Sequence, residues 1–97
     1  MKLNQMMKQA RALQEKLKQQ LDAVQVEATA GGGMVRVSMN GNKTVTSVHI
    51  DPEVVDKEDV EMLQDLVIAA VNEASRKVDE AAQREIGSLA GNIPGLF

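Results

Sequence analysis

The spacing of apolar residues changes twice along this chain, from a helical period to a strand period and back, and this pattern limits the folds available to it. Over residues 2–22, apolar side chains recur at steps of three and four, and no Gly or Pro interrupts them. This spacing predicts an amphipathic helix. Its apolar stripe, which continues to Val24, consists of Leu3, Met6, Met7, Ala10, Leu13, Leu17 and Leu21.

The next part of the chain alternates apolar and polar side chains, which is typical of half-buried strands. Three such runs, at about 24–30, 34–40 and 43–50, are separated by a triple glycine and by an Asn-Gly-Asn turn. They predict a three-stranded antiparallel meander with one apolar face. A triple glycine also occurs in phosphate-binding loops, but the Lys and the helix that complete that motif do not follow here, so a hairpin turn is favoured.

A second helix is predicted at about 57–86. The sheet ends at Pro52, because proline cannot donate a hydrogen bond to a strand ladder. Asp56 is the expected N-cap, and the acidic residues after it favour the positive end of the helix dipole. The apolar residues of this helix cover more than one side, which indicates burial against more than one surface. Residues 87–97 are rich in helix breakers and are expected to form a flexible tail.

The whole chain, residues 1–97, is the length of one small domain of the α+β class, with the order α-β-β-β-α. Its second helix would be ~45 Å long at 1.5 Å per residue, whereas a seven-residue strand spans only ~23 Å. The helix should therefore extend beyond its own sheet, and the sheet leaves two edges unpaired. Both features predict a homodimer.

Composition excludes several classes of function. The chain has no Cys and one His, which excludes disulfides, thiolate chemistry, Cys-ligated zinc and iron–sulfur clusters, and any site with several His ligands from one chain. No apolar run approaches the ~20 residues of a membrane span, and the N-terminus is too polar for a signal peptide. These features predict a cytoplasmic protein without a cofactor, a bound metal, a membrane partner or a small-molecule substrate.

Two patterns resemble chemical sites, but neither has the required spacing. Ser47, His49 and Asp51 alternate along one strand, where such neighbours stand ~6.5–7 Å apart, too far for the ~2.6–3.2 Å bonds of a catalytic relay. The acidic residues near the start of the second helix lack the ligand spacing and central glycine of a calcium loop. The chain is therefore not expected to be an enzyme.

Charge is unevenly distributed along the chain, whose net charge is −3. Residues 1–50 carry seven cations and three anions, whereas residues 51–97 carry four cations and eleven anions. The cations of the first helix lie outside its apolar stripe, an arrangement that can contact phosphates. No recognition motif or stacking aromatic accompanies them, so the pattern alone also fits a solvated face.

Several segments together resemble the YbaB/EbfC family of bacterial nucleoid-associated proteins. They are MMKQARALQEKLKQQL, VEATAGGGMVRVSMNGNKTVTSVHIDPEV, DLVIAAVNEASRKV and the terminal NIPGLF. The resemblance implies an intertwined homodimer that forms through the sheet, with projecting helical arms. It also implies binding to duplex DNA in the nucleoid with little sequence specificity, and an effect on DNA conformation and gene expression.

The resemblance places DNA on the arms, where phosphate contacts give affinity without reading base sequence. The expected DNA-binding residues are Lys2, Lys8, Arg11, Lys16, Lys18, Arg76, Lys77 and Arg84. An alternative is a prefoldin-like protein-interaction or chaperone module, because the plan of two helices around hairpins is similar and apolar arm surfaces would grip client proteins. Rising ionic strength should weaken DNA binding, whereas apolar client binding should persist.

Overall fold

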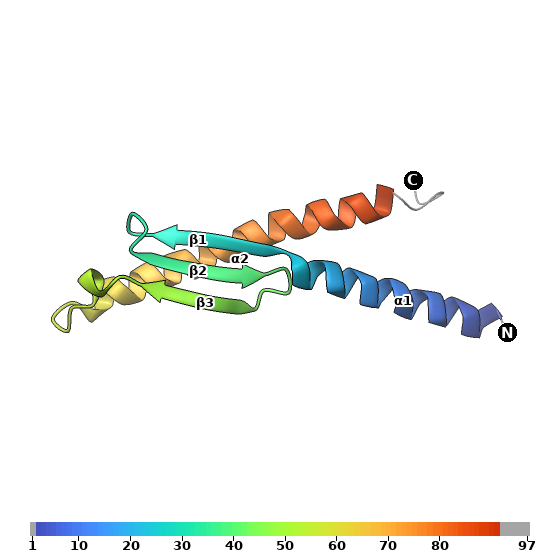
Figure 1. The fold of residues 1–97 in the computed structure, drawn as a ribbon, viewed down its shortest axis with the longest axis horizontal. Helices are drawn as coiled ribbons and strands as arrows, with labels where there is room; N and C mark the ends of the chain where they lie inside the picture. The colour runs from blue at the N-terminus through green and yellow to red at the C-terminus, as the bar shows by residue number, and fades with distance from the viewer. Residues whose placement is uncertain (1, 92–97) are drawn as a thin grey trace.

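The computed structural model describes residues 2–91 of the chain. In chain order the elements are α1 (Lys2–Ala23), β1 (Gln25–Ala30), β2 (Val35–Asn40), β3 (Val45–Ile50), the short 3-10 helix η1 (Pro52–Val54) and α2 (Val60–Gly91). The strands form one antiparallel sheet in the order β1-β2-β3, so the predicted α+β class and α-β-β-β-α order are confirmed. The molecule is elongated, with extents of 66 × 23 × 17 Å (Figure 1).

The core lies between α2 and the two strands that it crosses, β1 and β2. Val35 and Val37 of β2 are fully buried and pack with Ala70 and Ala74 of α2. Because alanine side chains are short and these two lie four residues apart on one face, α2 can approach the sheet closely. Among the residues whose burial the structure describes, the buried set is Ala28, Val35, Val37, Met39, Val54, Ala70, Ala74 and Val78. This core is small and entirely aliphatic.

Strand β3 extends the apolar face of the sheet, but helix α2 does not cover this strand. Val48 pairs with Val37, and Val45 pairs with Met39. Val45 and Val48 therefore lie on the same face of the sheet that α2 covers at β1 and β2. A bulge beside Met39 brings Val45 to this position, where strict alternation would place Thr46. Val48 nevertheless remains 48% exposed, since α2 lies over β1 and β2. The outer edge of β3 has no paired strand within residues 2–91.

Helix α1 projects from the sheet with none of its residues buried. Only its last turns lie against the rest of the chain, where Leu17 and Leu21 are half-buried. The C-terminal part of α2 leaves the same end of the sheet, and the two helices diverge from there (Figure 1). We call residues 2–18 the α1 arm and residues 79–91 the α2 arm.

The ends of α2 differ from those expected from sequence. The helix begins at Val60 instead of residue 57, and Asp59, not Asp56, caps it by accepting a hydrogen bond from the Met62 N–H at 3.2 Å. Asp56 instead accepts from the Glu58 N–H at 2.9 Å, which closes a turn before the helix. At the other end the helix continues through Gly91, so residues 87–91 are helical where a tail was expected.

The remainder of the predicted tail, residues 92–97, lies outside the described residues. A single glycine inside a helix costs only about 1 kcal/mol, which the good helix formers around Gly87 can offset. The three strands begin one or two residues later than expected, within the usual uncertainty of element ends. No helix in residues 2–91 has the combination of length and apolar character that a membrane span requires.

Candidate nucleic-acid interface

Helix α1 carries the predicted cations on a freely exposed surface. Lys2, Lys8, Arg11, Lys16 and Lys18 are all exposed. None of them forms an ion pair with any other residue in the described part of the chain. Glu15 and Asp22 are the only anions of this helix, so it has an excess of positive charge on an acidic protein. Exposed, unpaired cations on a projecting helix are available to a polyanion.

The five cations surround the apolar stripe instead of forming one row. At 100° per residue, Arg11 and Lys18 lie within about 20° of each other along one flank, and Lys8 lies opposite the stripe. Lys2 and Lys16 lie along the other flank. A groove of about 800 Å³ runs beside the first flank, and its lining includes Arg11, Lys18 and Leu21. The α1 arm therefore presents positive charge on every side except the apolar one.

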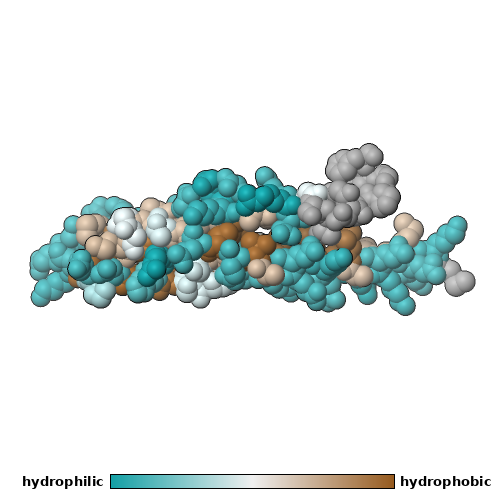
Figure 2. Space-filling model, turned by 45° about the horizontal axis from the view of Figure 1, so that its top comes forward, coloured by the Kyte–Doolittle hydropathy of each residue, from teal (hydrophilic) through white to brown (hydrophobic). Residues whose placement is uncertain are grey.

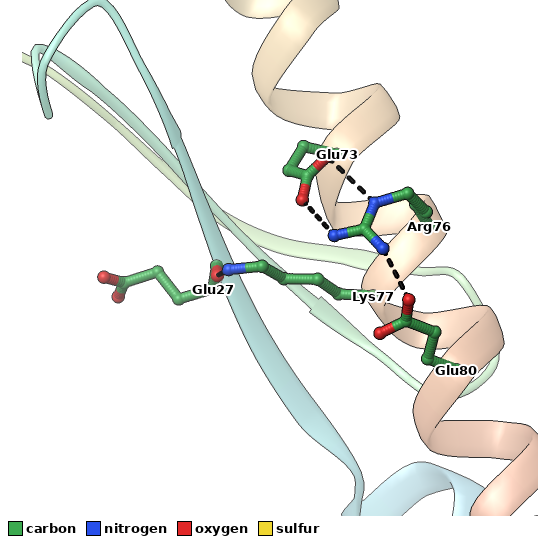
Figure 3. Close-up of polar contacts among 5 residues, drawn as sticks. All are labelled: Glu27, Glu73, Arg76, Lys77 and Glu80. Atoms are coloured by element: carbon green, nitrogen blue, oxygen red, sulfur yellow. Dashed lines mark hydrogen bonds and ion pairs between the residues drawn. The ribbon is translucent and has the colours of Figure 1, made fainter.

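Arg76 of α2 is engaged by two carboxylates of its own helix. Its Nε and Nη2 donate to Glu73 at 3.1 and 2.5 Å, and its Nη1 donates to Glu80 at 2.5 Å (Figure 3). The hydrogen bond with Glu73 raises the pKa of the Arg76 guanidinium and lowers the pKa of the Glu73 carboxyl. The local charge of this group of three side chains is negative. Glu73 and Glu80 lie three residues before and four residues after Arg76, and this spacing in the sequence already predicts ion pairs on one face of a helix.

Lys77 is half-buried and extends towards β1. Its Nζ donates to the backbone carbonyl oxygen of Glu27 at 2.8 Å (Figure 3). This bond satisfies an acceptor of the β1 edge and ties α2 to the sheet. Arg84 differs from both residues, because it lies on the α2 arm, is exposed and forms no ion pair within residues 2–91. The structure thus places six of the eight predicted cations on or near the arms and two over the sheet.

Comparison with known proteins identifies the family of this chain. The YbaB/EbfC DNA-binding family matches residues 1–93. The chain belongs to this family. A nucleoid-associated protein from Alkaliphilus metalliredigens is 53% identical over 100 aligned residues, which cover 98% of this chain and 88% of that protein. A nucleoid-associated protein from Syntrophobacter fumaroxidans is 54% identical over 95 residues, which cover 93% of this chain and 86% of that protein.

The fold of this YbaB/EbfC family member is also similar to a crystal structure. An uncharacterized protein from Helicobacter pylori superposes with a TM-score of 0.74 at 24% sequence identity. The match covers 90% of this chain and 91% of the other. The resemblance drawn from the sequence segments is therefore confirmed, both for the family and for the fold.

One further cation of this YbaB/EbfC protein, Lys43, lies at the base of the arms, and no sequence pattern indicated its position. Lys43, in the turn between β2 and β3, pairs with Asp79 of α2 through Nζ and Oδ1 at 2.8 Å. Its backbone is left-handed, with φ of 62°. The neighbouring asparagines and glycine predicted the turn, but no spacing rule connects residues 36 positions apart. Only the folded chain brings Lys43 to α2.

The triad-like pattern of Ser47, His49 and Asp51 and the acidic residues do not form a chemical site in the described part of the chain. Asp51, the third member of the triad-like pattern, accepts a hydrogen bond from the Glu53 N–H at 2.9 Å and caps η1. Ser47 and His49 are exposed on the sheet face turned away from α2. Within the described residues, no three His, Cys, Asp or Glu side chains come together as metal ligands would. The arm cations remain the strongest candidate site.

Proposed function

We propose that this YbaB/EbfC family member is a nucleoid-associated protein that acts by binding duplex DNA and not by catalysis. The observation that carries the proposal is the α1 arm, a projecting helix with five exposed cations that lack partners within residues 2–91. Relatives that are about half identical to this chain carry the name nucleoid-associated protein. Such relatives support the same role for this chain.

Phosphates are the groups that this arm is suited to contact. Lysine and arginine on a solvent-facing helix supply affinity by releasing the counterions of DNA, and this term does not depend on base sequence. Because the whole chain is acidic, binding should be confined to the arms and should weaken steeply with salt. Arg84 would add to the α1 cations from the opposite arm, whereas Arg76 and Lys77 are held by partners within the chain.

A homodimer completes the proposal, and the uncovered side of α2 is the surface that supports it. Ile50 of β3 and Leu63, Val67 and Ile68 of α2 line an apolar groove of about 500 Å³. Ile68 is 57% exposed, and the apolar side chains of Val48 and Val45 continue the surface along β3. Figure 2 shows apolar side chains between polar ones in the central part of the molecule. An apolar surface of this kind favours a protein partner.

The two sheet edges are not equivalent as partners for a second copy. The β1 edge has a carbonyl that Lys77 already occupies, whereas the β3 edge, beside the apolar groove, pairs with no other strand in the described part of the chain. A two-fold axis near β3 would cover both uncovered grooves at once, because each copy offers the same patch. The α1 arms would then extend from one assembly and act on the same duplex.

The proposed function is tested by titrating two unrelated fluorescently labelled duplexes with the protein and measuring anisotropy at low and at physiological salt. We expect similar affinities for the two duplexes, within the ~10⁻⁴–10⁻⁶ M range of non-specific binding at physiological salt, and much tighter binding at low salt. Absence of binding to both duplexes at low salt would contradict the proposal. A strong preference for one duplex would contradict the phosphate mechanism.

One observation favours a second function, the prefoldin-like protein-interaction module. The apolar stripe of the α1 arm is uncovered, and Leu3 and Met6 are 68% and 63% exposed. Such a stripe could hold unfolded client proteins. Suppression of the aggregation of a chemically unfolded protein, measured by light scattering at low and high salt, separates the two functions. Suppression that persists at high salt, together with no DNA binding, would favour the chaperone-like function.

A further inference from the structure

The turn between β2 and β3, residues 40–44, contacts α1 at the base of its arm. The Gly41 N–H lies 2.9 Å from the carbonyl oxygen of Leu21 and 3.2 Å from that of Val24, and donates to both. The Asn42 side-chain amide donates to the carboxylate of Asp22. Leu21 lies in the last turn of α1, where the final carbonyl acceptors have no partners within the helix, and Val24 directly follows the helix. The turn thus acts as a cap for α1.

The same turn contacts α2 through the pair of Lys43 and Asp79, at the first residue of the α2 arm. Hydrogen bonds within the turn stabilise its conformation, because the Asn40 side-chain oxygen accepts from the N–H groups of Asn42 at 2.9 Å and Thr44 at 3.2 Å. Asn42 also lines the groove beside the cationic flank of α1. One short turn is therefore bonded to both helices where they leave the sheet.

Few other contacts hold the direction of α1. None of its residues is buried, and its stripe is exposed over most of its length. The closest approach is at Gly41, where a Cβ atom would lie 2.3 Å from the carbonyl oxygen of Leu21. Real Cβ atoms do not approach a backbone oxygen so closely, so any other residue must push α1 or the turn aside. The backbone of Gly41 does not have a positive φ. Glycine is therefore required at this position by the close approach of α1 and not by the backbone conformation.

We propose that the 40–44 turn is the positioning element of the arms: it sets the angle between the α1 arm and the α2 arm and thereby the spacing of the cations presented to DNA. The turn does not contact DNA in this proposal. The link to DNA rests on the proposed function, whereas the effect on the angle between the arms does not.

The first test measures the distance between the arms in Gly41→Ala. Because the chain has no cysteine, Ala12→Cys and Gln83→Cys provide unique sites for spin labels on the two arms. Mixing with excess unlabelled chain keeps each measured pair within one subunit of a dimer. Gly87→Ala is the matched control, since a Cβ atom there would meet nothing within 4 Å. We expect the distance distribution to shift or broaden in Gly41→Ala and to stay native in Gly87→Ala.

The second test removes and restores the ion pair. Lys43→Asp places two carboxylates together, and aspartate tolerates the left-handed backbone at this position. The double variant Lys43→Asp/Asp79→Lys has the net charge of the native protein and rebuilds the pair in reverse. We expect a broader distance distribution in the single variant and a narrower, native-like one in the double variant. The charge-reversal experiment can still be performed if circular dichroism shows that Gly41→Ala does not fold.

DNA affinity, measured on the same variants without labels, decides the functional link. We expect weaker binding by Gly41→Ala and native binding by Gly87→Ala and by the charge-reversed double variant. A folded Gly41→Ala with a native distance distribution overturns the proposal, as does a Lys43→Asp variant that the second substitution does not restore. A changed distance with native DNA affinity overturns the link to DNA. If the native protein binds no DNA, the proposed function fails, while the distance measurements still test the positioning element.

Discussion

Replacing Arg11 and Lys18 with alanine should reduce the salt dependence of DNA binding and leave the fold intact. Both side chains are exposed, lie on one flank of α1 and form no ion pair within residues 2–91. Their removal should change the free energy of unfolding by less than ~0.5 kcal/mol, as is usual for exposed positions. Circular dichroism and the melting temperature check this condition first.

The magnitude follows from counterion release. Each phosphate contact contributes about 0.9 to the slope of log K against log salt. In a homodimer the two substitutions remove four positive charges, so the slope should become shallower by up to ~3.6 if all four contact phosphates. Between 50 and 200 mM salt, the native protein would then lose up to ~150-fold more affinity than the variant.

The assay is fluorescence anisotropy with a labelled duplex at four or more salt concentrations. The matched control is Arg36→Ala/Lys57→Ala, which removes one arginine and one lysine from exposed positions outside the arms. We expect the control to keep nearly the native slope, because only arm cations contact DNA in the proposal. A dimeric Arg11→Ala/Lys18→Ala variant with the native slope, or equal losses in both double variants, would refute the reasoning.

Three further predictions concern the core, the dimer and Lys77. Val37→Ala should reduce the free energy of unfolding by about 2 kcal/mol through lost burial and cavity formation, and equal melting temperatures for variant and native protein would place the core elsewhere. Val48→Lys should give monomers in light scattering, whereas Ser47→Lys, on the opposite sheet face, should remain dimeric. Lys77→Met should lose the hydrogen bond to β1, worth about 1 kcal/mol, and keep the native salt slope; a markedly shallower slope would show that Lys77 contacts phosphate.

Local patterns in the sequence determined the order and type of the elements. The steps of three and four in α1, the alternation in β1 and β2 and the turn residues between the strands each depend on neighbours in the chain, so they can be read without knowledge of the fold. The placement of cations outside the apolar stripe of α1 follows from the same geometry. The ion pairs of Arg76 with Glu73 and Glu80 were also accessible, since they lie within one helix.

Only the tertiary structure decided which surfaces are covered and which cations are engaged. Strands β2 and β3 both carry a valine at the paired positions 37 and 48, yet Val48 is exposed and Val37 is buried, because α2 is placed over β1 and β2. The contacts of Lys77 with β1 and of Lys43 with α2 join residues far apart in the chain. Such contacts depend on how whole elements pack, which the spacing of residues within one element does not specify.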